Sequence, residues 1–211
     1  MHAQFSSIMV YLLGFVAQGF FSARMLIQWV LSERQKRVVS PSIFWLCSLA
    51  GSVLLCVYGI LRDDFAIVFG QFISYYIYIW NLDIKGLWRK MPAPIRVVFY
   101  ALPVVAAGII VSHGQEFLSR FFHNERVPLW LLIYGSAGQV LFTLRFVYQW
   151  WYSNRLKRSE LPLGFWIISL TGCFIIVSYG LLRLDPVLVL GQSVGFVTYT
   201  RNIIIYKRQD K

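Results

Sequence analysis

Acidic residues are scarce in this chain of 211 residues, which has nine aspartates and glutamates against twenty lysines and arginines. Histidine is rarer still, with three copies. All nine acids lie at the edges of apolar segments or in the loops between them. Proton-coupled membrane transporters usually carry an Asp, Glu or His within a membrane segment. The scarcity therefore favours a process that is not coupled to protons.

The chain also lacks the residue groupings that catalysis and metal binding need. No nucleophile–base pair is recognisable, and the three histidines are too dispersed for a metal site. Cys47, Cys56 and Cys173 lie in apolar segments without CxxC spacing, which predicts buried structural thiols. We therefore expect no cofactor and no metal, and an enzyme is the least expected class of protein.

Apolar residues dominate what remains: 58% of the chain is hydrophobic and only 14% is charged. A hydrocarbon core of ~30 Å takes roughly 20 helical residues to cross, and seven stretches reach or approach that length. We expect an all-α membrane protein with seven transmembrane helices and no soluble domain. The predicted spans are Met9–Leu31, Ile43–Leu61, Phe65–Leu82, Ile95–Ser112, Leu129–Tyr152, Leu163–Leu182 and Val187–Tyr206.

The basic residues are distributed unevenly over the predicted loops. Thirteen lysines and arginines fall on one side of the membrane and four arginines on the other. By the positive-inside rule, the N-terminus is periplasmic and the C-terminus is cytoplasmic. The net charge of +11 is therefore a topology signal with anionic lipid headgroups as its partners, and we expect no binding of nucleic acid.

The first half of the chain is repeated in the second half at a constant offset of 121 residues. Between Gly14 and Asn81, about 26 of 68 positions are identical to their counterparts, and no gap is needed. One consequence is that the first apolar segment recurs within the chain, so we do not expect it to be a cleaved signal peptide. A tandem duplication of this kind predicts two equivalent bundles.

An odd number of helices in each copy would leave the two copies antiparallel, so one extra helix is needed to make them parallel. We expect three-helix bundles at 9–82 and 129–206, joined by a linker helix at 95–112. This is a three-plus-one-plus-three architecture with an axis along the membrane normal. Between the linker and the second bundle, residues 113–127 predict either a helix on the periplasmic interface or an ordinary polar loop.

Polar side chains recur on one face of the first and third helix of each copy. Such stripes are costly against lipid, so we expect them to face a cavity or a packed seam. On the first helices they are Gln18, Arg24 and Gln28, and Gln139, Arg145 and Gln149. On the third helices they are Gln71, Ser74, Tyr78 and Asn81, and Gln192, Tyr199 and Asn202.

The two arginines, Arg24 and Arg145, are the sharpest feature of these stripes. An arginine at the centre of a membrane helix costs ~2.5–3.5 kcal/mol on insertion scales, and no acid lies within the segments to compensate it. An anionic ligand fits this pattern, and phosphate fits best because a guanidinium can engage it with two hydrogen bonds. The alternative is structural, with the side chains reaching an interface or capping backbone carbonyls.

The pattern of Gln28-Trp29, Pro41, Phe44-Trp45, Gly70-Gln71 and Asn81 resembles the lipid A biosynthesis N-terminal domain family, and the second copy matches it again. The family is similar to the PQ-loop and SWEET transporters, whose architecture agrees with the one expected here. The resemblance implies a bacterial inner-membrane protein that handles a glycolipid beside enzymes of lipopolysaccharide assembly. The Pro-Gln pair that names the PQ-loop group is missing, because Gln28 and Gln149 follow Ile27 and Tyr148.

Our sequence-based hypothesis is a flippase for a polyprenyl-phosphate-linked monosaccharide, for example an aminosugar, with a glycosyltransferase as a further partner. Two alternatives stay open: a transporter of small soluble sugars, and a non-transporting scaffold for enzymes of lipid A biosynthesis. For the glutamines, packing between helices is as good an interpretation as substrate binding. The predicted substrate-binding residues are Arg24, Arg145, Gln28, Gln149, Gln18, Gln139, Gln71, Gln192, Tyr78, Tyr199, Asn81 and Asn202.

Overall fold

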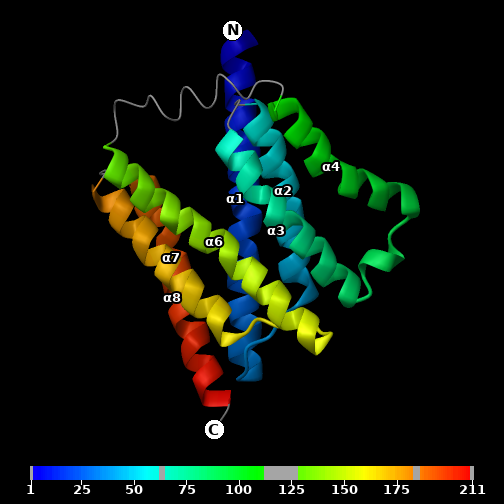
Figure 1. The fold of residues 1–211 in the computed structure, drawn as a ribbon, viewed down its shortest axis with the longest axis vertical. Helices are drawn as coiled ribbons and strands as arrows, with labels where there is room; N and C mark the ends of the chain where they lie inside the picture. The colour runs from blue at the N-terminus through cyan, green and yellow to red at the C-terminus, as the bar shows by residue number, and fades with distance from the viewer. Residues whose placement is uncertain (1, 62–64, 112–127, 183–185, 210–211) are drawn as a thin grey trace. The chain divides into compact units, whose positions relative to one another are not determined.

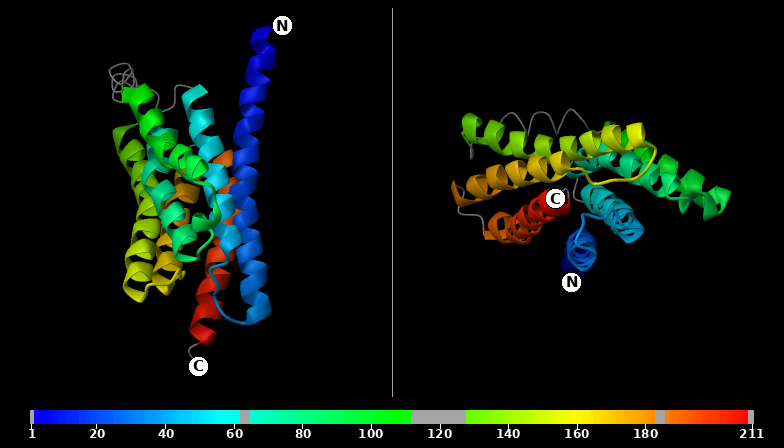
Figure 2. Two further views of the ribbon diagram at one scale, coloured as in Figure 1. Left: turned by 90° about the vertical axis from the view of Figure 1, so that its right-hand side faces the viewer. Right: turned by 90° about the horizontal axis from the view of Figure 1, so that it is seen from below.

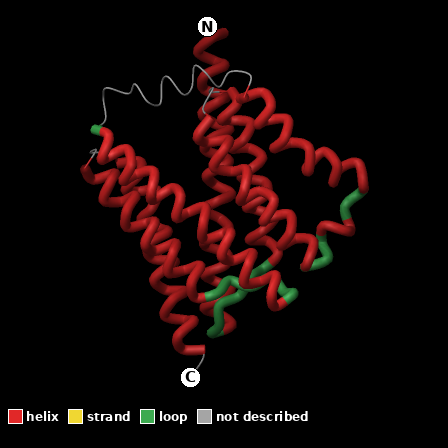
Figure 3. Tube along the Cα trace, in the orientation of Figure 1, coloured by secondary structure: helices red, strands yellow, loops and turns green. Residues whose placement is uncertain are grey.

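The structure is a computed structural model that describes residues 2–61, 65–111, 128–182 and 186–209. Within these ranges the chain is helical, and short loops connect the helices (Figure 3). The expected all-α class is therefore confirmed. The predicted interfacial helix or loop at 113–127 lies outside the described residues.

Each predicted apolar segment coincides with a helix (Figure 1). The helices extend up to seven residues beyond the predicted ends because polar residues continue the helical turns past the apolar runs. The α-helices are α1 (His2–Gln35), α2 (Ser42–Leu61), α3 (Phe65–Ile84), α4 (Ala93–Val111), α6 (Leu129–Leu156), α7 (Leu163–Leu182) and α8 (Pro186–Gln209), and a 3₁₀ turn, η1, spans Trp88–Lys90.

One helix among the described residues, α7, is long and apolar enough to cross a membrane by length and composition. Two shorter apolar stretches, Ser42–Tyr58 and Ala93–Ala106, lie in α2 and α4. The prediction of seven membrane spans is therefore not confirmed by the structure, and it stays a prediction.

The chain forms two compact units, and their boundary does not follow the sequence repeat. Unit 1 contains residues 1–24 and 45–124, and unit 2 contains residues 25–44 and 125–211. Two of the three boundaries fall inside helices, after Arg24 in α1 and after Phe44 in α2, and the third lies outside the described residues. Helix α1 is nevertheless one continuous helix (Figure 2). Residues 25–35, the C-terminal part of α1, therefore belong to unit 2.

Unit 1 is held together by close contacts at small residues and by tyrosine hydroxyls. A Cβ atom added to Gly14 of α1 would lie 2.9 Å from the Tyr58 ring of α2, and one added to Gly51 would lie 3.2 Å from the Ala17 carbonyl oxygen. The absent side chains thus let α1 and α2 approach closely. Helix α4 is attached to α3 by the Tyr75 hydroxyl, which donates to the Phe99 carbonyl at 2.9 Å.

Unit 2 repeats the contacts of unit 1 at equivalent positions. A Cβ atom on Gly135 of α6 would lie 2.8 Å from the Tyr179 ring of α7. Trp166 of α7 lies beside Tyr199 of α8, with ring centroids 6.2 Å apart and planes at 41°. The equivalent pair in unit 1, Trp45 and Tyr78, has values of 6.1 Å and 42°. The duplicated sequence therefore packs its helices in the same way twice.

Helices α1 and α6 end in the same way, and both ends belong to unit 2. Lys36 and Lys157 adopt positive φ angles of 53°, which reverse the chain after each helix. The following N–H groups, of Arg37 and Arg158, return to the carbonyls of Ser32 and Ser153 at 3.2 Å. The two loops that follow are thus built to one pattern.

Candidate functional site

The Arg24 side chain is buried inside unit 1, with 5% of its surface exposed. Its Nη1 atom donates to the Ser48 hydroxyl of α2 at 2.8 Å and to the Tyr78 hydroxyl of α3 at 3.3 Å. The guanidinium carbon lies 4.6 Å from the centre of the Phe21 ring, one turn earlier on α1. Helix α1 thus directs the cation toward hydroxyl groups and an aromatic face.

Arg145 occupies the equivalent position in unit 2, with 7% exposure. Its Nη1 atom donates to the Tyr199 hydroxyl of α8 at 2.9 Å. The guanidinium carbon lies 4.2 Å from the centre of the Phe142 ring and 4.8 Å from that of Phe146. Each copy therefore buries one guanidinium with a tyrosine hydroxyl and aromatic rings among its neighbours. Substrate binding by Arg24, Arg145, Tyr78 and Tyr199 stays a prediction.

Hydroxyls and ring faces stabilise a guanidinium without neutralising its charge. A cation over an aromatic ring gains ~0.5–2 kcal/mol, and the larger value applies to desolvated pairs. The three acidic side chains that the structure describes in ion pairs are engaged with other arginines. These pairs are Glu33–Arg201, Asp83–Arg89 and Glu160–Arg158. Each unit thus buries a guanidinium among hydroxyl groups and aromatic rings.

Gln28 and Gln149 hold the two loops of unit 2 by the same set of hydrogen bonds. The Gln149 side-chain N–H donates to the Ser153 hydroxyl and to the Glu160 carbonyl, both at 2.9 Å. The Glu160 N–H in turn donates to the Ser153 hydroxyl at 3.0 Å. Each partner lies 4 or 11 residues after the glutamine. We call this arrangement the loop clamp.

The first copy has the same loop clamp at the end of α1. Gln28 donates to the Ser32 hydroxyl at 2.9 Å and to the Val39 carbonyl at 3.3 Å. The Val39 N–H donates to the Ser32 hydroxyl at 3.2 Å. Gln28 also exchanges two hydrogen bonds with the Asn202 amide of α8, at 2.8 and 3.1 Å. Both donors and the acceptor of the Gln28 amide are therefore used by protein groups.

The remaining predicted site residues are placed separately. Asn81 donates to the Ile77 carbonyl of its own helix at 2.9 Å. Gln71 accepts a hydrogen bond from the Ser52 hydroxyl at 3.1 Å, and the backbone carbonyl of Gln192 accepts one from the Cys173 thiol at 3.4 Å. Gln18 is exposed. The side chain of Gln139 lies outside the described residues. Substrate binding by these amides stays a prediction.

Sequence reasoning missed the serines that contact Arg24 and that take part in the loop clamp. Ser32 and Ser48 recur as Ser153 and Ser169, so the repeat itself contained the signal. It also missed the Glu33–Arg201 ion pair, in which Arg201 Nη2 lies 3.1 Å from Glu33 Oε2 and the Trp29 indole donates to Oε1 at 3.0 Å. The three cysteines are free and buried, as predicted.

Comparison with known proteins identifies the duplicated segment. A family model described as Lipid A Biosynthesis N-terminal domain matches residues 13–83 and again residues 134–204. These matches together cover more than half of the chain and confirm the tandem repeat. No solved structure matches the chain. The similarity to PQ-loop and SWEET transporters stays a prediction.

Curated relatives match nearly the whole chain. Proteins named lipid-A-disaccharide synthase are similar to it in Chlamydia pneumoniae, with 32% identity over 95% of this chain and 34% of the relative. The relative in Chlamydia felis is 31% identical over 94% of this chain and 33% of its own length. The relative in Chlamydia trachomatis serovar D is 32% identical over 99% of this chain and 36% of its own length. The chain thus spans about a third of the length of the curated relatives it matches.

These relatives correct one expectation. The lack of a nucleophile–base pair predicted that the protein is not an enzyme, but the matching relatives are named as a synthase. The prediction was wrong because it was based on the residues of this segment alone, whereas the relatives contain further residues outside it. The segment occurs in proteins about three times its length, and the residues of the rest of those proteins cannot be read from this sequence.

Proposed function

Because the chain belongs to the Lipid A Biosynthesis N-terminal domain family, we propose that it acts in the membrane on a phosphorylated glycolipid of lipopolysaccharide assembly and moves it between the leaflets. In its specific form, the substrate is a polyprenyl-phosphate-linked monosaccharide. In this proposal the seven helices cross the bacterial inner membrane as two parallel three-helix bundles joined by α4.

The observation that carries the proposal is the burial of one guanidinium in each copy, at Arg24 and Arg145. A buried cation among hydroxyls and ring faces is held in place but keeps its charge, so a phosphate oxygen that reaches it gains a charge-assisted hydrogen bond. Tyr78 and Tyr199 hold the two guanidiniums from the third helix of each copy. They would also offer the phosphate a hydroxyl donor as it arrives.

The apolar surroundings of each arginine support a lipid-linked substrate over a free sugar. Phe21 lies against Arg24, and Phe142 and Phe146 lie against Arg145. Aromatic faces accept a sugar ring or an isoprenoid chain, whereas a soluble sugar needs many hydrogen-bonding groups. The lipid tail would stay in the bilayer while the phosphate contacts a buried guanidinium.

The test is transport by the purified chain in vesicles. A fluorescent polyprenyl-phosphate monosaccharide is placed in one leaflet, and its appearance in the other is measured by dithionite quenching. We expect Arg24→Ala and Arg145→Ala each to lower the rate at least tenfold. The matched control is Arg89→Ala, whose side chain is 75% exposed and which we expect to transport at the wild-type rate. Wild-type rates in both buried-arginine variants would falsify the proposal.

The length of the relatives supports a second candidate function. Since the chain spans about a third of proteins named as a synthase, it can serve as a membrane segment that positions a glycosyltransferase and holds its lipid. In that case it co-purifies with a glycosyltransferase of the same cell, and the isolated chain moves no lipid in the vesicle assay. Transport by the isolated chain excludes this candidate as the complete function.

A further inference from the structure

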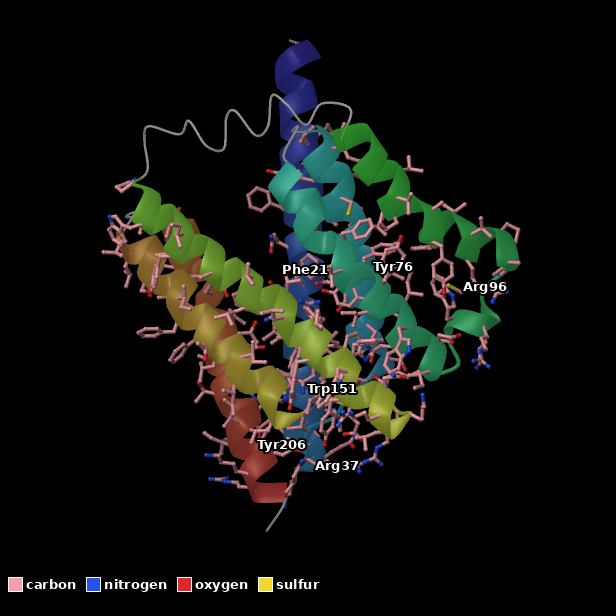
Figure 4. All side chains as sticks on the ribbon, in the orientation of Figure 1. Phe21, Arg37, Tyr76, Arg96, Trp151 and Tyr206 are labelled. Atoms are coloured by element: carbon pink, nitrogen blue, oxygen red, sulfur yellow. The ribbon has the colours of Figure 1, made fainter. Side chains whose placement is uncertain are left out.

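The two clamped loops of unit 2 line a polar cavity of about 340 Å³ that is open to the surface. Its walls come from the end of α1, from the loop that follows it and from the loop after α6. The cavity contains Arg37, which Figure 4 labels on the loop after α1. The polar residues that line it are Gln35, Arg37, Ser40, Ser159 and Glu160. We propose that this cavity binds the phosphate monoester of a small headgroup.

The cavity is formed by segments that the fold holds in place. Gln28 and Gln149 fix the two loops through the Val39 and Glu160 carbonyls. The hydroxyl oxygens of Ser40 and Ser159 lie 3.0 Å apart and join the loops directly. The Val38 N–H also donates to the Gln209 side chain at the end of α8 at 2.9 Å. A site that is held before binding loses little conformational entropy when a ligand arrives.

The charge of the cavity fits an anion. Arg37 is exposed, and its guanidinium makes two contacts of 3.4 Å to Gln35 Oε1, which are weak enough for a ligand oxygen to replace. Arg34 and Lys36 precede it in the sequence. Glu160 is the acid in the lining, and Arg158 holds its carboxylate at 2.9 Å, which offsets its charge. The remaining positive charge belongs to Arg37 and its basic neighbours.

The donors in the cavity fit a phosphate group. A guanidinium engages two oxygens of one phosphate in a planar fork. The Ser40 and Ser159 hydroxyls and the Gln35 amide lie on the same cavity walls and can reach further oxygens or a sugar hydroxyl. A volume of about 340 Å³ is at the lower end of the range for small-molecule pockets, roughly 300–1,000 Å³, so it admits a headgroup and excludes a polymer.

This site goes beyond the proposed transport function because it does not use the buried arginines. Arg24 and Arg145 lie within helices, whereas Arg37, Ser40 and Ser159 lie on loops. The phosphate can come from two sources, the headgroup of a membrane lipid or a soluble sugar phosphate. The recognition chemistry is the same for both, so the experiment must separate them.

The test measures binding, not transport, with the full chain in nanodiscs of phosphatidylcholine. In the first arm, glucosamine 1-phosphate is titrated by calorimetry. In the second arm, nanodiscs contain one tenth phosphatidic acid, and native mass spectrometry counts the bound phosphatidic acid. The variants are Arg37→Ala and the double change Ser40→Ala with Ser159→Ala. Arg89→Ala is the control, because Arg89 is an exposed basic residue outside the cavity.

We expect binding in at least one arm, and we expect Arg37→Ala to weaken it at least tenfold while Arg89→Ala leaves it unchanged. Binding in the calorimetric arm identifies a soluble phosphate as the source, and enrichment of phosphatidic acid alone identifies a lipid. Arg37→Lys should bind more tightly than Arg37→Ala, because lysine keeps the positive charge but lacks the planar fork of the guanidinium.

The proposal is overturned by binding in neither arm, or by equal binding in Arg37→Ala and the control. A loss of transport in Arg24→Ala with intact headgroup binding would leave both proposals standing.

Discussion

At the scale of single residues, charge is used in two ways in this protein. Arg24 and Arg145 are buried and have tyrosine hydroxyls and rings among their neighbours. Glu33 and Arg201, in contrast, form an ion pair at the partly exposed end of α1. The equivalent residues of the other copy are Asn154 and Trp80, so the sequence can make this pair only once.

The Glu33 pair predicts a dependence of stability on pH. Hydrogen bonds from Arg201 and Trp29 lower the pKa of the Glu33 carboxyl below its ordinary value of 4.5. A carboxyl whose pKa is depressed in the folded state contributes stability above its unfolded pKa and loses it as the pH falls through the folded pKa. We expect wild type to have a higher Tm than Glu33→Gln near neutral pH, and this difference to shrink below about pH 4.5.

The measurement is thermal unfolding in detergent at several pH values. The control is Asp83→Asn, which breaks the more exposed Asp83–Arg89 pair and should change Tm less, because exposed pairs contribute little. A difference between wild type and Glu33→Gln that stays constant from neutral to acidic pH contradicts the assignment.

At the scale of helices, packing depends on glycines that face tyrosine rings. Gly14 meets Tyr58 between α1 and α2, and Gly135 meets Tyr179 between α6 and α7. The duplication has preserved both members of each contact. Gly19 on α1, in contrast, has open space where a Cβ atom would lie.

These glycines allow a prediction with a control on the same helix. Gly14→Ala and Gly135→Ala place a methyl group 2.9 and 2.8 Å from a ring, so the helices must separate or the ring must shift. We expect each to lower the free energy of unfolding by about 1–3 kcal/mol, the usual cost of overpacking. Gly19→Ala should instead be neutral or raise it by up to ~1 kcal/mol, because alanine favours the helix. Reversible unfolding in mixed micelles measures both, and equal effects at Gly14 and Gly19 contradict the packing argument.

At the scale of the whole molecule, the distribution of basic residues predicts how the chain crosses the membrane. The loops after α1 and α6, the η1 turn and the end of α8 contain clusters of lysine and arginine. The positive-inside rule places all of them in the cytoplasm. Pro128, which precedes α6, belongs to the opposite side in this arrangement.

Cysteine accessibility tests this topology. In a chain whose Cys47, Cys56 and Cys173 are replaced by serine, a single cysteine is introduced as Lys90→Cys or Pro128→Cys; both positions are exposed. An impermeant maleimide should label Pro128→Cys in intact spheroplasts, and Lys90→Cys only after the membrane is opened. Labelling of both variants in intact spheroplasts contradicts the seven-span arrangement.

Much of the architecture and part of the candidate site could be read from the chain alone. Apolar runs located each α-helix in the part of the chain that the structure describes, because burial of an apolar surface stabilises a helix. The spacing of the stripes predicted that Arg24, Arg145, Tyr78 and Tyr199 face inward, because residues on one helical face have a fixed spacing. The hydrogen bonds from Arg24 to Tyr78 and from Arg145 to Tyr199 were found only in the structure. The loop clamp was missed because it joins a helix to a backbone carbonyl 11 residues later, and nothing in the side-chain pattern indicates that the loop folds back.

The duplication follows from a direct comparison of the two halves of the chain. The helical class and the inward position of one cation per copy follow from composition and periodicity, which depend on residues close together in the sequence. Three-dimensional packing decided where the compact units divide, which amide exchanges hydrogen bonds with Gln28, and that two loops line an open cavity beside Arg37. These features join residues as many as 174 positions apart. Contacts over such distances depend on how helix surfaces fit together, and periodicity along one segment contains no information about that fit.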